Sequence, residues 1–179
     1  MVSVPFSNSG AKKNSNFKKD FNGENSGLVP PQNIQAEESV LGGILLDPDA
    51  IGRIADIIKP EAFYISSHKE IYRTALMLHS QGKPTDLTAM SAWLADNGSL
   101  EKIGGNNKLV ELVENVSSTA SIEQIASLIS DKFLRRQLIK SGNEVVQLGF
   151  DQSQATEEVL DKAEQKIFEI SQEKPSKGL

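Results

Sequence analysis

The 179-residue chain contains no cysteine and only two histidines, His68 and His79. Without cysteine the chain has no disulfide, no thiolate nucleophile and no cysteine metal site. The two histidines are eleven residues apart on one expected helix. They therefore lie about three turns from each other, too far to share a metal ion. We expect each histidine to be a packing or surface residue and not an acid or base.

Long apolar runs and nucleotide-binding motifs are also absent. The longest uncharged apolar block, Ser39 to Leu46, is far shorter than the ~20 residues of a membrane span. The N-terminus lacks the apolar core of a signal peptide. A phosphate-binding loop fails because Gly82-Lys83 is followed by Pro84, and no Gly-x-Gly-x-x-Gly exists. We therefore expect no membrane span, no catalytic residue, and no metal or cofactor site in this chain.

Charge is unevenly distributed along the chain. The net charge is -5 and the pI is near 5.1, which disfavours a surface that binds nucleic acid throughout. Four lysines against Asp20 and Glu24 give residues 1–29 a charge of +2, so the remaining 150 residues carry -7. Ser, Asn and Gly supply 13 of those first 29 residues. This composition buries too little apolar surface to order a chain, so we predict that residues 1–29 form a disordered basic tail.

Capping signals predict helices through the rest of the chain. Asn33 is placed to cap a first helix, and Asp47 with Pro48 is placed to begin a second. Ser67 and Glu70 have the spacing of a capping box. No segment shows sustained alternation of β-branched residues, so we expect no sheet. The expected helices are 33–46, 47–58, 67–82, 86–97, a short turn at 99–103, 109–116, 121–148 and 156–172.

Three further local features lead to expectations. Glu37-Glu38 lies in the first turn of the first helix, where acidic residues compensate the helix dipole. Gly42-Gly43 weakens the propensity of that helix but permits close backbone packing. Ser121 to Gln124 is a second capping box, and Thr156 is placed to cap the last helix.

These elements predict an all-α fold, with a small helical head at 30–117, a long antiparallel helical hairpin at 118–173 and the start of a linker at 174–179. A hairpin of two helices has no core of its own, and the long helix carries more apolar residues than the shorter one can cover. Exposed apolar surface of this kind marks association, so we predict that the hairpin dimerises. The candidate interface residues are Ile125, Ile129, Leu134, Leu138, Val145, Leu148, Ile167 and Ile170.

A basic cluster lies on the long helix and has three interpretations. Its members are Lys132, Arg135, Arg136 and Lys140. We favour salt bridges to the last helix, which is rich in Asp and Glu and is expected to pack alongside. The alternatives are a surface for nucleic acid and a surface for an acidic partner protein.

The segment from Pro30 to Asp47, PPQNIQAEESVLGGILLD, resembles the opening signature of the DnaB-type replicative DNA helicases of bacteria. The resemblance covers about 30–173, and its departures are Lys108, where an aromatic residue is usual, and Ile125, where tyrosine is common. It continues through Phe63-Tyr64 with His68, Ile71-Tyr72, Gly82 to Asp86, Gly98-x-Leu100 and Gly104-Gly105.

This resemblance implies an N-terminal domain whose hairpins pair, three pairs forming a collar on a hexameric ring. In that family the collar holds the C-terminal domain of primase and helps contacts with the helicase loader. A linker helix and a RecA-like ATPase domain follow, and they bring ATP, Mg and most of the DNA contact. The resemblance therefore implies a non-enzymatic fragment of a bacterial, cytoplasmic, nucleoid-associated helicase.

Two other functions stay open at this point. The helicase-binding C-terminal domain of primase resembles the same architecture, although the Gly42-Gly43 signature near a start methionine favours the helicase. The other is a small DNA-binding module that would use Arg135, Arg136 and the basic tail.

Overall fold

The computed structural model describes residues 28–116 and 120–173, and every regular element in these two ranges is a helix. The expected all-α class is confirmed, whereas residues 1–27 of the predicted tail and residues 174–179 of the predicted linker lie outside the described residues. The elements are α2 (Ile34–Leu46), α3 (Ala50–Ile54), the 3-10 turn η2 (Pro60–Ala62), α4 (Ser66–Ser80), α5 (Leu87–Asp96), the 3-10 turn η3 (Glu101–Ile103), α6 (Gly105–Glu114), α7 (Ile122–Phe150) and α8 (Thr156–Gln172).

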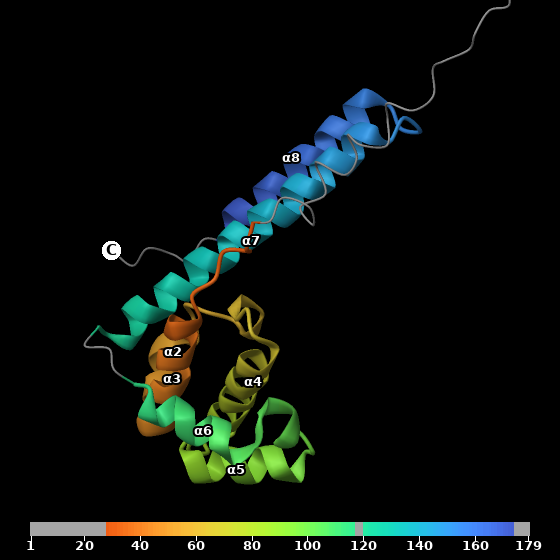
Figure 1. The fold of residues 1–179 in the computed structure, drawn as a ribbon. Helices are drawn as coiled ribbons and strands as arrows, with labels where there is room; N and C mark the ends of the chain where they lie inside the picture. Colours follow the sequence, from red (N-terminus) through yellow and green to blue (C-terminus); the bar gives the residue numbers. More distant parts are fainter. Residues whose placement is uncertain (1–27, 117–119, 174–179) are drawn as a thin grey trace, which may run out of the picture.

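Helix α2 lies at the centre of the head and packs against α4, α6 and the first turns of α7 (Figure 1). Asn33 caps it as expected, because its side chain accepts the amide hydrogen bond of Ala36 at 3.0 Å. Gly42 lets α6 approach closely, since a Cβ there would lie 2.1 Å from the carbonyl oxygen of Leu112. Lys108 of α6 also reaches back to α2, where its Nζ lies 3.1 Å from Glu38.

The core of the head is mainly apolar. The rings of Phe63 and Tyr72 pack at a tilt of 37° with centroids 4.9 Å apart, and the Tyr72 hydroxyl donates to the carbonyl of Ile58 at 2.9 Å. That hydrogen bond satisfies the one polar atom of a fully buried ring. Each of the helices α2 to α6 contributes other large side chains that are fully buried, among them Leu41, Ile44, Ile51, Ile54, Ile71, Met90, Leu94, Leu109 and Leu112.

Two of the expected helix starts are wrong. Asp47 accepts the amide of Asp49, two residues on, as an N-cap residue would, but Pro48 and Asp49 form a turn and the regular helix α3 begins only at Ala50. That helix also ends at Ile54, before the expected residue 58. Ser67 does not cap α4, which begins one residue earlier and has no side-chain cap from its own N-cap residue.

Of the two helix caps expected in the hairpin, one is present and the other is not. Ser121 and Gln124 form the expected capping box, with both hydrogen bonds at 3.3 Å. Thr156 is already the first residue of α8, and the N-cap residue Ala155 offers no side-chain acceptor.

Helix α7 joins the head to the hairpin as one continuous helix of 29 residues. Its first turns pack into the head, and its later part runs beside α8 away from the head (Figure 1). The sequence pattern had placed Ile125 and Ile129 in a hairpin interface, but both residues are occupied by contacts with the head. They are 7% and 2% exposed and belong to the same core as α2.

Candidate protein-interaction surfaces

The hairpin carries a row of apolar side chains that its two helices do not cover. Leu138 of α7 is 54% exposed, and Ile167 and Phe168 of α8 are 47% and 60% exposed. Helix α8 has no buried residue at all. The other expected interface residues on this part of the chain are half-buried, namely Leu134, Val145, Leu148 and Ile170.

An apolar groove runs between the two hairpin helices. Its volume is about 590 Å³. A Cβ added at Gly142 would meet no atom within 4 Å, so the missing side chain there leaves room in the groove. The lining residues are Gly142, Val145, Ala163, Glu164, Ile167, Phe168 and Ser171.

An ion pair joins α7 and α8 near this groove. Its cation lies on α8 and its carboxylate on α7, the reverse of the expected arrangement. Lys166 of α8 lies 2.5 Å from Glu144 of α7. The hydrogen bond from Lys166 and its positive charge hold the pKa of Glu144 below its ordinary value. The same bond and the Glu144 charge raise the pKa of Lys166.

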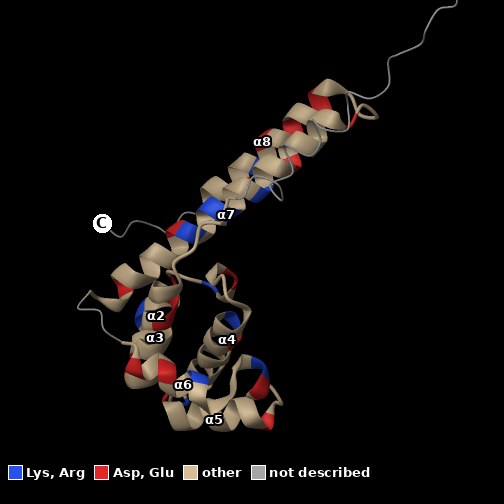
Figure 2. Cartoon of the chain, in the orientation of Figure 1, with Lys and Arg blue, Asp and Glu red and all other residues tan. Residues whose placement is uncertain are grey.

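The basic cluster does not pair with α8 as we had favoured. Figure 2 shows Lys and Arg on the stretch of α7 that leaves the head. Arg135 pairs with Asp131 of its own helix at 3.0 Å, while Arg136 turns toward the head. Among residues 28–116 and 120–173, neither Lys132 nor Lys140 forms an ion pair with α8. Arg136 is thus removed from the exposed charged surface.

Arg136 donates to two backbone carbonyls of the head. The distances are 2.7 Å to the oxygen of Pro31 and 2.6 Å to the oxygen of Ala62. Its guanidinium also lies 5.5 Å from the ring centre of Tyr64 and 5.8 Å from that of Phe133. Burial lowers the pKa of Arg136, and the Glu37 carboxylate opposes that effect.

Glu37 is a buried anchor and not simply a charge that compensates a helix dipole. It is 1% exposed, and its carboxylate accepts the amide of Tyr64 at 2.6 Å and the amide of Ile65 at 3.4 Å. It also lies 2.8 Å from Nδ1 of His68, itself 1% exposed. Glu37 thus fixes Tyr64 and Ile65, the two residues that directly precede α4, and His68 is a packing residue.

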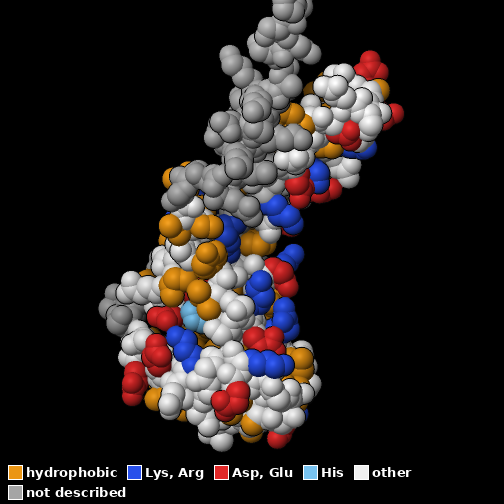
Figure 3. Space-filling view, turned by 45° about the vertical axis from the view of Figure 1, so that its right-hand side comes forward, with side chains coloured by type: hydrophobic (Ala, Val, Ile, Leu, Met, Phe, Trp, Pro, Cys, Tyr) orange, Lys and Arg blue, Asp and Glu red, His pale blue; other side chains and the backbone are white. Residues whose placement is uncertain are grey.

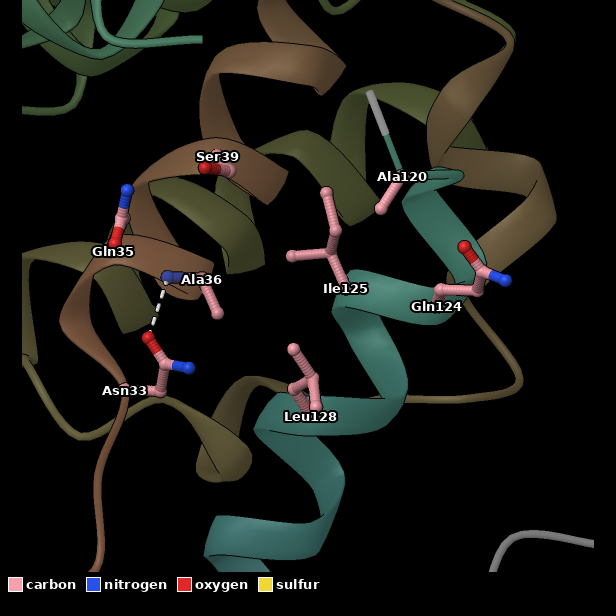
Figure 4. A pocket seen from close by; sticks show the side chains of 8 residues that line it. All are labelled: Asn33, Gln35, Ala36, Ser39, Ala120, Gln124, Ile125 and Leu128. Atoms are coloured by element: carbon pink, nitrogen blue, oxygen red, sulfur yellow. Dashed lines mark hydrogen bonds between the residues drawn. The ribbon is translucent and has the colours of Figure 1, made fainter. Parts of the chain in front are cut away.

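A second hollow lies between α2 and α7 (Figure 4). It has a volume of about 390 Å³. Ile125 and Leu128 give it an apolar wall, and Leu128 remains 50% exposed. Amide and hydroxyl groups of α2 and of the start of α7 complete the lining, which comprises Asn33, Gln35, Ala36, Ser39, Ala120, Gln124, Ile125 and Leu128.

Of the side chains that line the two hollows, only Glu164 is ionisable. Within the described ranges, no three His, Asp or Glu side chains gather as a metal site would require. No helix there is long and apolar enough to span a membrane. Figure 3 instead shows apolar side chains grouped on the head near the base of the hairpin, with both charge signs around them. The described residues thus form a helical domain that presents apolar surface suited to protein contacts.

Comparison with known proteins gives this domain a family. Residues 29–131 match the family model described as the DnaB-like helicase N terminal domain. The crystal structure of the N-terminal domain of DnaB helicase from Mycobacterium tuberculosis has a TM-score of 0.72 and 38% sequence identity. That comparison covers 79% of this chain and 99% of the other. The chain belongs to the DnaB-like helicase N-terminal domain family, as its resemblance indicated.

Two curated relatives are replicative DNA helicases named DnaB. The one from Nostoc is 55% identical over 159 residues, which are 89% of this chain and 18% of the relative. The one from Geobacillus stearothermophilus is 38% identical over 148 residues, 83% of this chain and 33% of the relative. This chain therefore spans between about a fifth and a third of the length of these relatives.

Proposed function

We propose that this chain is the N-terminal collar domain of a bacterial replicative DNA helicase, where it assembles the hexamer through its hairpin and binds primase and the loader. The whole protein would unwind DNA with ATP and Mg in a RecA-like domain, in the cytoplasm and at the nucleoid. The observation that carries the proposal is the uncovered apolar groove between α7 and α8.

The groove favours a partner of similar shape over a small ligand. It is open along the hairpin, and exposed Leu138, Ile167 and Phe168 lie on the same two helices. Apolar surface that projects from a small domain is costly in water, so it favours association. A second hairpin offers the same apolar row, which suits a self-complementary contact with two-fold symmetry. The residues proposed for this contact are Leu134, Leu138, Val145, Leu148, Ile167 and Ile170.

The proposal for primase is supported by a solved relative. A DnaB-like replicative helicase, described together with its interactions with primase, matches 77% of this chain with a TM-score of 0.65 and 28% identity. We place the primase contact on the head, because the hairpin groove is assigned to self-association. Two cations of α7, half-buried Lys132 and exposed Lys140, remain candidates for binding an acidic surface of a partner protein.

Sedimentation equilibrium tests the self-association. We expect a dimer or larger assembly of this 179-residue chain at micromolar concentration. A monomer at high micromolar concentration would refute pairing through the hairpin. The mass measured again with a cognate primase C-terminal domain tests the second part, and no increase at micromolar concentrations of both would refute primase binding.

A further inference from the structure

Helix α7 is held to the head by an apolar contact and by a polar contact, and Phe133, which lies between them, also packs against the core. The first is apolar, where Ile125, Ala126 and Ile129 are buried in the core of the head. The second is polar and lies seven residues later, at Arg136. Seven residues of α-helix correspond to about 10 Å, so Arg136 contacts the head about 10 Å further along the helix axis than Ile129 does.

The polar contact joins three parts of the chain that are far apart in sequence. Arg136 donates to Pro31, which precedes α2, and to Ala62, which ends η2. The planar fork of a guanidinium can hold two carbonyl oxygens at once, which a lysine ammonium on a flexible stem does less well. The rings of Tyr64 and Phe133 flank the guanidinium and keep it in this position.

The segment that receives Arg136 is itself fixed to the head. Tyr64 and Ile65, which follow Ala62 closely, donate their amides to the buried carboxylate of Glu37 on α2. The loop before α4 is thus held by an acceptor from α2 and by a donor from α7. A rigid receiving segment is what a positioning contact requires.

We propose that Arg136 is the latch that fixes the direction in which the hairpin leaves the head. Without it, α7 would keep its apolar contact but could rock about it. A rocking of about 10° would move the far end of α7, about 30 Å beyond Ile129, by about 5 Å. The latch is a property of one chain and does not depend on pairing between hairpins.

Pulsed electron–electron double resonance, which measures the distance between two spin labels, tests this geometry directly. The chain has no native cysteine, so Ala92→Cys on α5 and Gln152→Cys in the hairpin turn, both exposed, provide two unique labelling sites. Labelled chains are mixed with an excess of unlabelled chain so that only distances within one chain are recorded. We expect one narrow distance distribution in the otherwise unchanged protein.

Two variants of the latch and one matched control decide the outcome. In Arg136→Gln and Arg136→Met, the distribution should broaden or shift by about 5 Å. Methionine keeps a long apolar stem against the two rings but has no donor for the carbonyls. Arg135→Gln, which removes the neighbouring exposed arginine, should leave the distribution unchanged.

Two results would overturn the proposal. One is an unchanged distance distribution in both Arg136 variants at full helicity. The other is loss of the folded head in both variants, because Arg136 would then determine folding and not direction.

Discussion

The close approach of α2 and α6 at Gly42 leads to a quantitative prediction for Gly42→Ala. The added Cβ would lie 2.1 Å from the carbonyl oxygen of Leu112 and 2.4 Å from Cγ2 of Val116. A carbon–oxygen contact is comfortable near 3.3 Å, so the overlap with Leu112 is about 1 Å. A backbone carbonyl cannot rotate away as a side chain can. Helix α6 must therefore move away from α2.

Two opposing effects determine the size of the change in stability. Alanine is a better helix former than glycine by about 1 kcal/mol, which favours the variant. Overpacking of a closed core costs about 1–3 kcal/mol, and the backbone clash places this case at the upper end. We expect the free energy of unfolding to fall by about 2 kcal/mol.

Urea unfolding followed by circular dichroism measures this difference, with all variants at one chain concentration because assembly changes apparent stability. Gly149→Ala is the matched control, since a Cβ at that position in α7 would meet nothing within 4 Å. It should leave stability unchanged or raise it by up to about 1 kcal/mol. A Gly42→Ala variant as stable as the unchanged protein would show that α2 and α6 are not in close backbone contact.

Three further predictions concern the hairpin and the buried carboxylate. Leu138→Glu should dissociate the proposed hairpin pair in sedimentation, at a cost of several kcal/mol for an unpaired buried charge, while Gln152→Glu in the exposed turn should not; equal masses would count against the pairing. Glu37→Ala leaves the amides of Tyr64 and Ile65 and the ring of His68 without their acceptor, so the free energy of unfolding should fall by roughly 2–4 kcal/mol in urea, and a loss below about 0.5 kcal/mol would contradict the anchor. The lowered pKa of Glu144 means that its ionised form stabilises the fold above the ordinary value of 4.5, and that this effect is lost as the pH falls through the folded-state pKa. The thermal unfolding temperature of Glu144→Gln should therefore depend less on acid than that of the unchanged protein. Identical acid profiles of the two proteins would exclude this contribution.

Local sequence signals predicted much of the fold because their partners lie within one helical turn. Asn33 and Ser121 bond to backbone amides three residues away, so their caps could be read from spacing alone. Ser67 has the same kind of spacing, but α4 already begins at Ser66, and Glu37, about 30 residues earlier, fixes the two residues before it by accepting the amides of Tyr64 and Ile65. A carboxylate brought in by tertiary packing leaves no local pattern.

The interface residues show a similar limit. Helical periodicity groups Ile125, Ile129 and Leu138 as apolar positions that need cover, but periodicity does not say which neighbour provides it. The structure gives Ile125 and Ile129 to the head and leaves Leu138 exposed. Arg136 was grouped with exposed cations for the same reason, because its two carbonyl partners lie 105 and 74 residues away.

The central position of α2 has a consequence for synthesis of the chain. The buried residues Val40, Leu41 and Ile44 are made before the α7 residues that help to cover this helix, such as Ile129, which follow about 85 to 90 residues later. At about 5–20 residues per second, several seconds or more separate the two during translation. During that interval α2 is an apolar segment without its final neighbours. The head can therefore close only after the first turns of α7 have been made, and until then the apolar face of α2 lacks part of its cover.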